Sequence, residues 1–294
     1  MTERAAAMII FHNPSCVDYE RAGDPERPDR ITRTVPVLGE RHSDWSWIEP
    51  AAATDEQLLR AHTREHIRLV AEPGGDFDSD TPAHRNIDRY ARAAAGAAIA
   101  AARTALRGEK AFSLMRPPGH HATRDQAMGF CYFSNVAVAA LDALQNGADR
   151  VAIWDFDAHH GNGTEDIVAS NERIAFASIH QSPGYPGTGL SSFGNIHNFP
   201  TPPHTTRRAH MKAIEDALQK LVDFKPDLLL VSAGFDAYAA DPITQMTLES
   251  EDFGIMGKWL TDLDIPAAAI LEGGYSDDLP ELIDAFLTAW ASTG

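Results

Sequence analysis

The stretch Val151-Ala-Ile-Trp-Asp-Phe-Asp-Ala-His-His-Gly-Asn-Gly-Thr164 begins with an apolar run and ends in a cluster of ionisable side chains. An apolar run without alternation predicts a strand buried on both faces, which is typical of a parallel sheet covered by helices. We therefore predict a strand over residues Val151–Phe156. Its carboxyl end then carries two aspartates, Asp155 and Asp157, followed by two histidines.

Similar short runs recur along the chain and alternate with longer amphipathic or alanine-rich segments. This pattern predicts βα units around a mostly parallel sheet. The other predicted strands are Met8–Phe11, Ala111–Met115, Ile174–Ile179, Asp227–Ser232 and Ala267–Leu271. The predicted helices are Ile87–Arg107, Asn135–Leu144, Thr206–Val222, Glu251–Leu263 and Pro280–Trp290.

One stretch, Ser182–Pro203, is rich in proline and glycine and shows little periodicity. It could be a linker between two domains, but the composition does not shift after it. Loops of this length inside compact domains are usually functional, so we predict an ordered surface loop. We accordingly predict a single α/β domain over residues 1–294.

The charge of the chain excludes some partners. Its 294 residues include 25 Lys and Arg against 42 Asp and Glu, a net charge of −17. This excess repels nucleic-acid phosphates and anionic membrane surfaces, so we expect neither as a partner and favour a basic or neutral one. The sequence does not determine the oligomeric state.

The cysteines and the apolar segments indicate in which cellular compartment the protein is located. Cys16 and Cys131 form no CxxC motif, and so sparse a set argues against a disulfide-stapled secreted domain. The N-terminus lacks the apolar region and cleavage site of a signal peptide, and no apolar stretch approaches the roughly 18 residues that span a bilayer. We predict a soluble cytoplasmic protein.

Four predicted strands each end in a cluster of ionisable or turn-forming residues. These clusters begin at Arg116, Asp155, Ser232 and Glu272. In open α/β sheets, ligands bind outside the carboxyl ends of the strands, so we expect the four clusters to converge on one crevice.

The cluster after residue 155 has the ligand types of a metal site. Asp157 and His159 lie two residues apart at a strand end, so their side chains leave the same face, with Asp155 next in that row. Together with Asp236 they suit a catalytic zinc ion with an open position. Carboxylate-rich sites also take manganese or iron, so the ligand types alone leave the metal open. The competing interpretation, a turn and a helix N-cap, does not account for the other clusters.

Further residues indicate acid–base chemistry. His120 and His121 follow a rigid Pro-Pro-Gly turn, and such imidazoles can deprotonate a metal-bound water and later protonate a leaving amine. Tyr275 follows two glycines and offers a phenolic donor to an oxyanion. The chain has no GxGxxG after a strand, no P-loop lysine and no GxSxG elbow, and Cys131 lies in an apolar context. Metal-assisted hydrolysis is therefore the reaction class that these residues indicate.

Five motifs occur in order along the chain: Arg116-Pro-Pro-Gly-His-His-Ala, Gly129-Phe-Cys-Tyr-Phe, Asp155-Phe-Asp-Ala-His-His-Gly-Asn-Gly-Thr, Ser232-Ala-Gly-Phe-Asp and Glu272-Gly-Gly-Tyr. Together they resemble the zinc-dependent histone deacetylase family, which includes bacterial acetylpolyamine amidohydrolases. The resemblance extends from about Asp24 to Phe286. It implies a single-domain arginase and deacetylase type of α/β fold, with a central parallel sheet of about eight strands flanked by helices.

The resemblance also implies the metal site. Zinc would be held by Asp157, His159 and Asp236, and would polarise the amide carbonyl while its bound water attacks. The related arginases bind two manganese ions and carry two further aspartates, at positions that are Gly161 and Tyr238 here. A second metal would lack these bridging carboxylates, so we predict one zinc ion per chain.

The acid–base roles follow from the same resemblance. His120 is expected to pair with Asp155 and His121 with Asn162, with His121 as the general base and acid. Tyr275 would donate to the tetrahedral oxyanion. Asn162 replaces the aspartate of many family members, as in the second class of eukaryotic deacetylases. A neutral amide stabilises an imidazolium less than a carboxylate does, so we expect His121 to be the less basic histidine.

The resemblance assigns five residues to the substrate tunnel. Phe130 and Tyr185 match the aromatic pair that walls an apolar channel for a methylene chain. Gly129 matches the backbone position that accepts the substrate amide. Asp80 matches a rim acid that holds the substrate backbone, although the sequence alone allows a helix N-cap or a solvated loop acid. Ile243 occupies a tunnel-mouth position that is Glu in a polyamine-selective relative.

Two more sites are implied. Arg27 resembles a residue near an acetate exit. A structural potassium or sodium ion is implied at Ser178 and at backbone groups of Asp155, Asp157, His159 and Ile179.

The expected activity is removal of an acetyl or other short acyl group from a lysine side-chain amine, with release of acetate. Ile243 favours lysine over polyamine substrates because it removes a cation-recognition carboxylate. An acetylpolyamine or other small acyl-amine deacetylase is the alternative, and a non-catalytic acyl-lysine binding protein is a remote one. The acidic surplus fits attraction of lysine-rich or polyamine substrates and does not distinguish between them.

Overall fold

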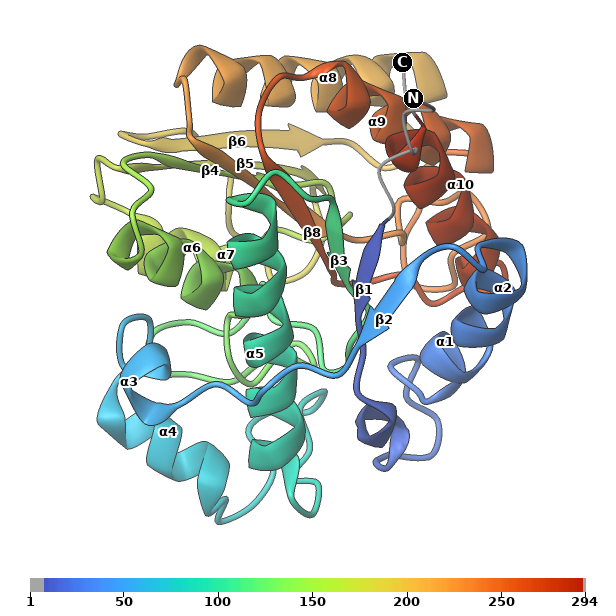
Figure 1. Ribbon diagram of the computed structural model, residues 1–294. Helices are drawn as coiled ribbons and strands as arrows, with labels where there is room; N and C mark the ends of the chain where they lie inside the picture. Colours follow the sequence, from blue (N-terminus) through green and yellow to red (C-terminus); the bar gives the residue numbers. More distant parts are fainter. Residues whose placement is uncertain (1–7, 293–294) are drawn as a thin grey trace.

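Eight parallel strands form one sheet in the computed structural model, which describes residues 8–292 (Figure 1). The strands are β1 (Ile9–Phe11), β2 (Ser46–Ile48), β3 (Ala111–Ser113), β4 (Val151–Asp155), β5 (Ile174–Gln181), β6 (Ile196–Thr201), β7 (Leu228–Ala233) and β8 (Ala267–Leu271). Their order across the sheet is β2-β1-β3-β8-β7-β4-β5-β6. The predicted α/β fold with a parallel sheet of about eight strands is confirmed.

Strand β4 lies inside the sheet, between β7 and β5, and all of its residues are buried. Both faces of such a strand are covered, which is why its sequence shows an apolar run rather than alternation. In the register of the sheet, Asp155 lies beside Ser178 of β5 and Ser232 of β7. The end of β4 therefore places its polar residues at the carboxyl edge of the sheet, between two neighbouring strand ends.

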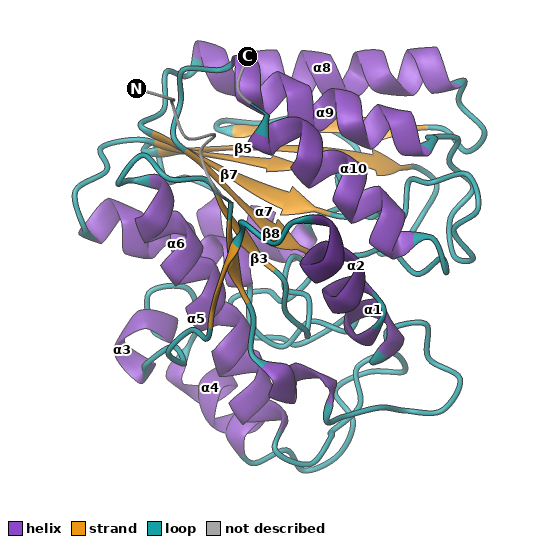
Figure 2. Cartoon of the chain, turned by 45° about the vertical axis from the view of Figure 1, so that its right-hand side comes forward, coloured by secondary structure: helices purple, strands orange, loops and turns teal. Residues whose placement is uncertain are grey.

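Helices cover both faces of the sheet (Figure 2). On one face, α5 (Ile87–Ala105) packs against α6 (Asn135–Gln145), and the opposite face carries α8 (Arg207–Asp223), α9 (Ser250–Asp262) and α10 (Leu279–Ala291). The shorter helices are the 3₁₀ turn η1 (Pro14–Val17), α1 (Asp29–Thr32), α2 (Thr34–Arg41), α3 (Asp55–Leu58), α4 (Arg64–Ala71) and α7 (Asn162–Val168).

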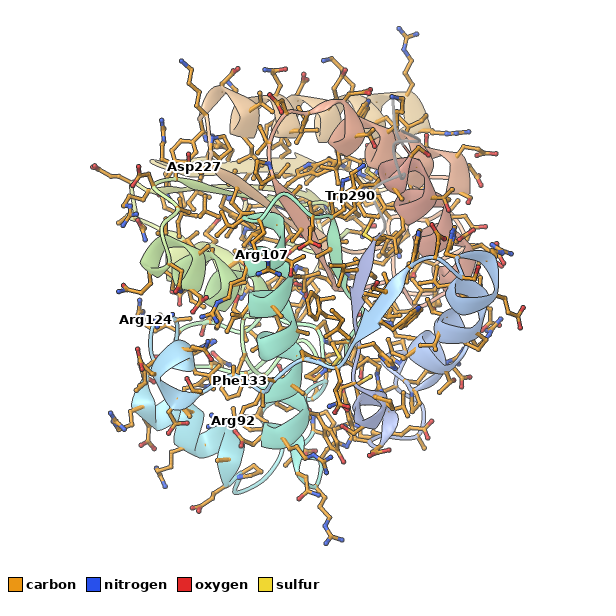
Figure 3. The ribbon with its side chains drawn as sticks, in the orientation of Figure 1. Arg92, Arg107, Arg124, Phe133, Asp227 and Trp290 are labelled. Atoms are coloured by element: carbon orange, nitrogen blue, oxygen red, sulfur yellow. The ribbon has the colours of Figure 1, made fainter. Side chains whose placement is uncertain are left out.

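Large side chains fill the space between the sheet and its helices. Trp154 of β4 and Phe156 are buried, as is Trp290 of α10, which Figure 3 labels. The Phe156 ring lies 5.7 Å from that of Phe286 of α10, so the strand that carries the ionisable cluster is anchored directly in the core.

The predicted strands and helices are all present, with ends that differ by a few residues at most. The two edge strands, β2 and β6, are absent from the predicted set. The surface loop that we predict over Ser182–Pro203 is wrong for Ile196–Thr201, which form β6 alongside β5. Pro200 lies within β6, and an edge strand tolerates proline because one of its sides needs no ladder donor. Polar residues and a proline leave such a strand without an apolar run.

No helix within residues 8–292 is long and apolar enough to cross a membrane. The prediction that the chain lacks a signal peptide rests partly on residues 1–7, which lie outside the described residues.

Candidate metal centre and adjoining cavity

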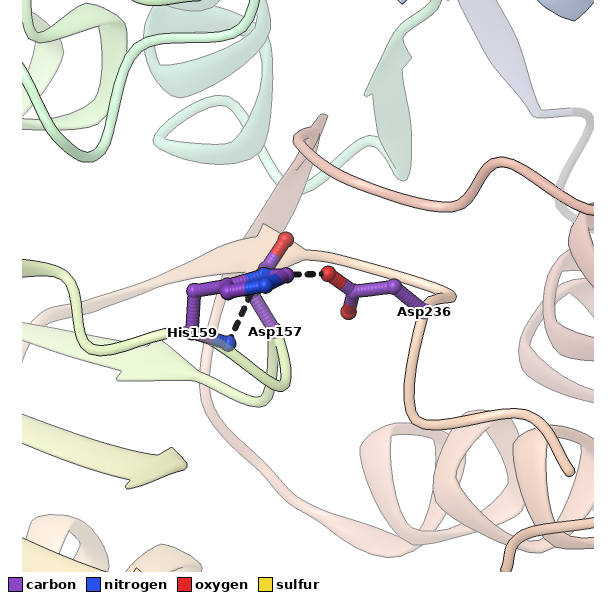
Figure 4. Close-up of side chains that lie close together, drawn as sticks. All are labelled: Asp157, His159 and Asp236. Carbon is purple, nitrogen blue, oxygen red and sulfur yellow. Dashed lines mark hydrogen bonds and ion pairs between the residues drawn. The ribbon is translucent and has the colours of Figure 1, made fainter. Parts of the chain in front are cut away.

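Two strand ends bring the candidate metal ligands together. Asp157 and His159 follow β4, and Asp236 follows β7. One ligand atom of each residue lies within 4.8 Å of the others (Figure 4). His159 Nδ1 lies 2.7 Å from Asp236 Oδ2 and 3.1 Å from Asp157 Oδ1. The three predicted ligands therefore form one cluster.

The backbone around this cluster orients both carboxylates. Gly273 N donates to Asp157 Oδ2 and Ala158 N donates to Asp236 Oδ1, each at 2.7 Å. Gly273 also leaves them room, since a Cβ there would lie 2.5 Å from Asp157 Oδ2 and 2.7 Å from Asp236 Oδ2. With one oxygen of each carboxylate fixed by the backbone, Asp236 Oδ2 is left facing the imidazole of His159.

The donor set fits a divalent metal ion. Asp157 and Asp236 are buried. Asp236 Oδ2 accepts no hydrogen bond from any residue between 8 and 292, and its close polar neighbour is His159 Nδ1. Buried anionic oxygens without compensation are costly, and a cation between them removes that cost. Two carboxylates and one imidazole are a ligand set that zinc uses where a fourth position stays open.

The pKa values of the cluster reflect its excess of buried negative charge. Burial alone would raise the pKa of Asp157, but His120 and His159 lower it well below its usual range. Burial and the charge of Asp157 raise the pKa of Asp236. Burial would lower the pKa of His159, yet Asp236 and Asp157 raise it well above the usual value. The two carboxylates therefore favour a positive charge beside them, which a bound cation would supply.

A pair of histidines lies beside the cluster, with ring centroids 4.0 Å apart. His120 Nδ1 lies 3.1 Å from Asp155 Oδ2, and His121 Nδ1 lies 2.8 Å from Asn162 Oδ1. Asn162 Nδ2 donates to His121 O and to Met128 Sδ, which turns Oδ1 toward the imidazole. His121 therefore donates from Nδ1, and its Nε2 is free to accept a proton.

The two histidines differ in basicity. Burial lowers the pKa of both rings, but Asp157 and Asp155 more than offset this for His120 and raise its pKa to about 10. His121 has an amide as its partner, and burial together with the charge of His120 lowers its pKa well below the usual value. His121 is thus the less basic of the two histidines, as expected because its partner is the neutral amide of Asn162.

Tyr275 lies on the turn after β8. Two side chains, Asp241 and Arg30, form hydrogen bonds with the backbone of this turn. The backbone N–H of Tyr275 donates to Asp241 Oδ2 at 2.7 Å. Arg30 Nε donates to Gly274 O at 2.8 Å, and the guanidinium carbon of Arg30 lies 4.9 Å from the centre of the Tyr275 ring. Neither Arg30 nor Asp241 is among the predicted site residues, because nothing in their local sequence indicates a partner so far along the chain.

Arg27, which the resemblance places near an acetate exit, lies at the surface. Its side chain is 41% exposed and pairs with Asp277 at 2.9 Å. It also lines, with Arg30 and Tyr275, a small space behind the tyrosine.

A cavity of about 310 Å³ opens in front of the candidate metal centre. It brings together all five residues predicted for the tunnel with two of the histidines and the tyrosine. Its lining residues are Pro25, Asp80, His121, Gly129, Phe130, His159, Tyr185, Ile243 and Tyr275. A larger groove lies between α8 and α9, but none of the candidate metal ligands or acid–base residues lines it. We therefore take the smaller cavity as the candidate functional site.

Two residues that the sequence did not single out support the tunnel wall. Gly129 N donates to Asp78 Oδ2 at 3.3 Å, and Phe130 N donates to Thr81 Oγ1 at 3.1 Å. Asp80 lies beside them and lines the cavity, with its own N–H bonded to Asp78.

Glu272 is a further buried acid at the same edge. Its Oε2 atom accepts hydrogen bonds from Gly119 N at 2.7 Å and from His120 N at 3.1 Å. Burial raises its pKa to about 7, while His120 opposes the increase. Glu272 belongs to the Glu-Gly-Gly-Tyr motif, but only the structure shows that it supports the turn before the histidine pair.

The residues predicted for a monovalent cation lie together. Asp155 and Ser178 are partners in the register of β4 and β5, and Ile179 follows Ser178. Ser178 Oγ lies 3.0 Å from His180 Nδ1. Cation binding by Asp155, Asp157, His159, Ser178 and Ile179 stays a prediction.

Fold and site together define an α/β enzyme with a candidate metal centre at the carboxyl edge of a parallel sheet, flanked by paired histidines and a buried tyrosine. The family model described as "Histone deacetylase domain" matches residues 24–290. The chain belongs to the histone deacetylase family, as its motifs predict, and membership assigns it to the metal-dependent hydrolases of the deacetylase and amidohydrolase class.

Individual relatives carry deacetylase or amidohydrolase names. A probable deacetylase of Archaeoglobus fulgidus is 36% identical over 290 residues, covering 91% of this chain and 81% of that protein. A histone deacetylase-like amidohydrolase of Pseudomonas aeruginosa is 39% identical over 248 residues, covering 76% of this chain and 65% of that protein. The crystal structure of an acetylpolyamine aminohydrolase from Burkholderia pseudomallei matches with a TM-score of 0.89 at 27% identity, covering 97% of this chain and 99% of that one.

Proposed function

We propose that the protein is a zinc-dependent deacylase that removes an acetyl or other short acyl group from a lysine side-chain amine and releases acetate. The observation that carries this proposal is that His159, which clusters with Asp157 and Asp236, lines the same cavity as His121 and Tyr275. One candidate metal ligand, the proposed base and the proposed oxyanion donor thus line one cavity.

Asp157, His159 and Asp236 would hold one zinc ion. When bound, zinc would polarise the amide carbonyl and lower the pKa of a coordinated water molecule. The neighbouring positions Gly161 and Tyr238 provide no carboxylate, which supports one metal ion per chain.

His121 is the general base and acid in this proposal. It lines the cavity, and its Nε2 atom is free because Nδ1–H donates to Asn162 Oδ1. It takes a proton from the attacking water and passes it to the leaving amine. His120 does not line the cavity and bonds to Asp155, so it contributes a buried positive charge beside the developing oxyanion.

Tyr275 donates its hydroxyl hydrogen to the oxyanion. Its ring is held between Arg30 and Phe130, whose ring centroid lies 5.9 Å away. A donor that is already in position costs little reorganisation during the reaction, which is how such groups lower a barrier.

The rim of the cavity supports lysine as the substrate amine. The methylene chain lies between Phe130 and Tyr185, Gly129 accepts the substrate amide N–H, and Asp80 holds the substrate backbone at the mouth. Ile243 at the mouth offers no carboxylate to a second amine. A deacetylase of acetylpolyamines or other small acyl amines is the second candidate, favoured by relatives named acetylpolyamine amidohydrolase.

The remaining assignments are also proposals. A potassium or sodium ion would bind near Ser178, acetate would leave past Arg27, and residues 1–294 would form one domain. Both cysteines are free and buried, which suits a protein of the reducing cytoplasm. We propose no nucleic-acid or membrane partner, because the net charge is −17.

The test compares acetyl-lysine peptides with acetylated polyamines, side by side, with and without a chelator. We expect chelator-sensitive acetate release from the peptides, restored by added zinc. Release from polyamines alone would select the second candidate. Binding of acyl-lysine peptides without release of acetate would instead identify a non-catalytic binding protein.

A further inference from the structure

One buried histidine outside the candidate active site lies at the base of a loop that forms a wall of the cavity. His62 lies between α3 and α4 and is 1% exposed. Its Nδ1 atom lies 2.9 Å from Thr123 O, and Ser134 N donates to its Nε2 atom at 3.0 Å. A single imidazole therefore contacts both ends of the loop 123–134.

These two contacts determine the protonation state of His62. A backbone N–H can only donate, so Nε2 carries a lone pair, and a carbonyl can only accept, so Nδ1 carries the hydrogen. A charged imidazole would direct an N–H group at the N–H of Ser134. Burial, with the neighbouring His66, lowers the pKa of His62 to about 3, which keeps the ring neutral near pH 7.

The loop that His62 closes carries the cavity wall at its tip. Met128 and Cys131 exchange two backbone hydrogen bonds of 3.0 Å, and the residues between them, Gly129 and Phe130, have φ angles of 56° and 68°. Positive φ at both central residues is typical of a tight type I′ turn. A phenylalanine rarely adopts that conformation, so the surroundings must hold the turn in place.

The surroundings hold the loop on two sides. The tip is held by hydrogen bonds that the backbone N–H groups of Gly129 and Phe130 donate to Asp78 and to the buried Thr81. The base is held by His62 and by His66, whose Nε2 atom lies 2.7 Å from Tyr132 O. Both imidazoles pack on the ring of Phe133, which Figure 3 labels, at centroid distances of 5.4 and 5.7 Å.

We propose that His62 is a positioning residue of the cavity: by joining Thr123 to Ser134 it holds Phe130 in place against the substrate chain. The inference rests on the proposed function, because the wall matters to catalysis only if an acyl-amine chain passes along it. His62 touches no reacting atom and acts through Phe130.

A wall residue contacts the chain equally in the ground state and the transition state. Loosening it therefore raises KM and leaves kcat nearly unchanged. We expect KM for an acetyl-lysine peptide to rise about fivefold in His62→Gln, the factor that one net hydrogen bond commonly contributes. We expect the same rise in KM in His62→Asn, because the side-chain amide of either variant can reach only one of the two loop ends, Thr123 or Ser134.

The matched control is His210→Gln. His210 is an equally buried histidine on α8, on the opposite face of the sheet, so this variant loses a core imidazole without touching the loop. We expect reduced thermal stability and an unchanged KM. A KM increase of the same size in both variants would overturn the proposal, since it would reflect general loosening of the core.

A double-mutant cycle tests whether His62 acts through the wall. Phe130→Ala removes the wall side chain, so adding His62→Gln to it should raise KM no further. Fully additive effects on KM would overturn the proposal.

Amide hydrogen exchange gives a readout that needs neither activity nor a folded variant. In the wild-type protein, the amides of Ser134 and Phe130 should exchange with a common opening rate, because one opening event releases both. Rapid exchange at Ser134 while Phe130 stays protected would overturn the proposal. If the wild-type protein hydrolyses no acyl amine, the proposed function fails, and the exchange measurement still decides whether His62 holds the loop.

Discussion

The carboxylate of Asp241 accepts a hydrogen bond from the backbone N–H of Tyr275, with Oδ2 and N 2.7 Å apart. Its other oxygen, Oδ1, accepts from Ile243 N at 3.0 Å. One buried side chain therefore connects the rim of the cavity to the residue proposed to stabilise the oxyanion. The position of the tyrosine therefore depends on a residue that does not itself line the cavity.

Asp241→Asn replaces one accepting oxygen by an NH₂ group, which leaves a buried N–H without an acceptor. We expect kcat to fall about tenfold, the factor that an unsatisfied buried donor commonly costs. Steady-state kinetics and metal analysis check this result. Loss of bound zinc in the variant would show that Asp241 supports the metal site instead.

Tyr275→Phe removes the proposed oxyanion donor and keeps the ring. We expect kcat to fall by about 100-fold or more, as when one oxyanion-hole donor is removed elsewhere. KM and zinc content should not change, because the ring still packs between Arg30 and Phe130. Unchanged kcat would exclude Tyr275 from the chemistry.

Asp236→Asn separates metal binding from folding. Asp157 and Asp236 are buried like charges, so removing one relieves repulsion in the metal-free protein, and we expect its Tm to equal or exceed that of the metal-free wild type. Added zinc should raise the Tm of the wild type but not that of the variant, because a ligand stabilises only the state that binds it. Thermal unfolding with and without zinc checks both statements. A zinc-induced increase of equal size in the variant would contradict the ligand assignment.

Ile243→Glu places a carboxylate at the mouth of the cavity. A second amine of an acetylpolyamine would pair with it, and a partly exposed ion pair contributes about 1 kcal/mol, or roughly fivefold. We expect the ratio of kcat/KM for acetylspermidine to kcat/KM for an acetyl-lysine peptide to rise by that factor. Ile243→Gln is the uncharged control and should leave the ratio unchanged. An equal increase in both variants would show that charge is not the cause.

Acid should destabilise the fold through His210. This side chain is buried in α8, its Nδ1 atom lacks a hydrogen-bond partner among residues 8–292, and burial lowers its pKa to about 4. In the unfolded chain the pKa of histidine is about 6.5. The folded state therefore binds fewer protons, and its stability, complete above pH 6.5, falls by about 1.4 kcal/mol per pH unit as the pH decreases toward 4.

Urea unfolding of His210→Leu tests this pH dependence. Because leucine does not titrate, we expect the free energy of unfolding to decrease less steeply between pH 6.5 and pH 4 than in the wild type, by about 1.4 kcal/mol per pH unit. Equal slopes would mean that His210 binds its proton in the folded state with about the same pKa as in the unfolded chain.

The sequence predicted the elements that are buried on both sides. An apolar run such as that of β4 results from burial of both faces, so the run identifies the strand. The edge strands β2 and β6 have a free side, and β6 contains Pro200, so neither shows such a run.

The sequence by itself also determined which residues form the candidate metal cluster, because the spacing of Asp157 and His159 after a buried strand places both side chains on one side of its end. Only the tertiary structure showed what supports the segments around that cluster, such as the turn of Tyr275 and the loop of Phe130. Arg30 meets Gly274 across 244 positions, and His62 meets Ser134 across 72. Periodicity and ligand type are local properties that a sequence displays directly, whereas a hydrogen bond between distant segments exists only after packing has brought them together.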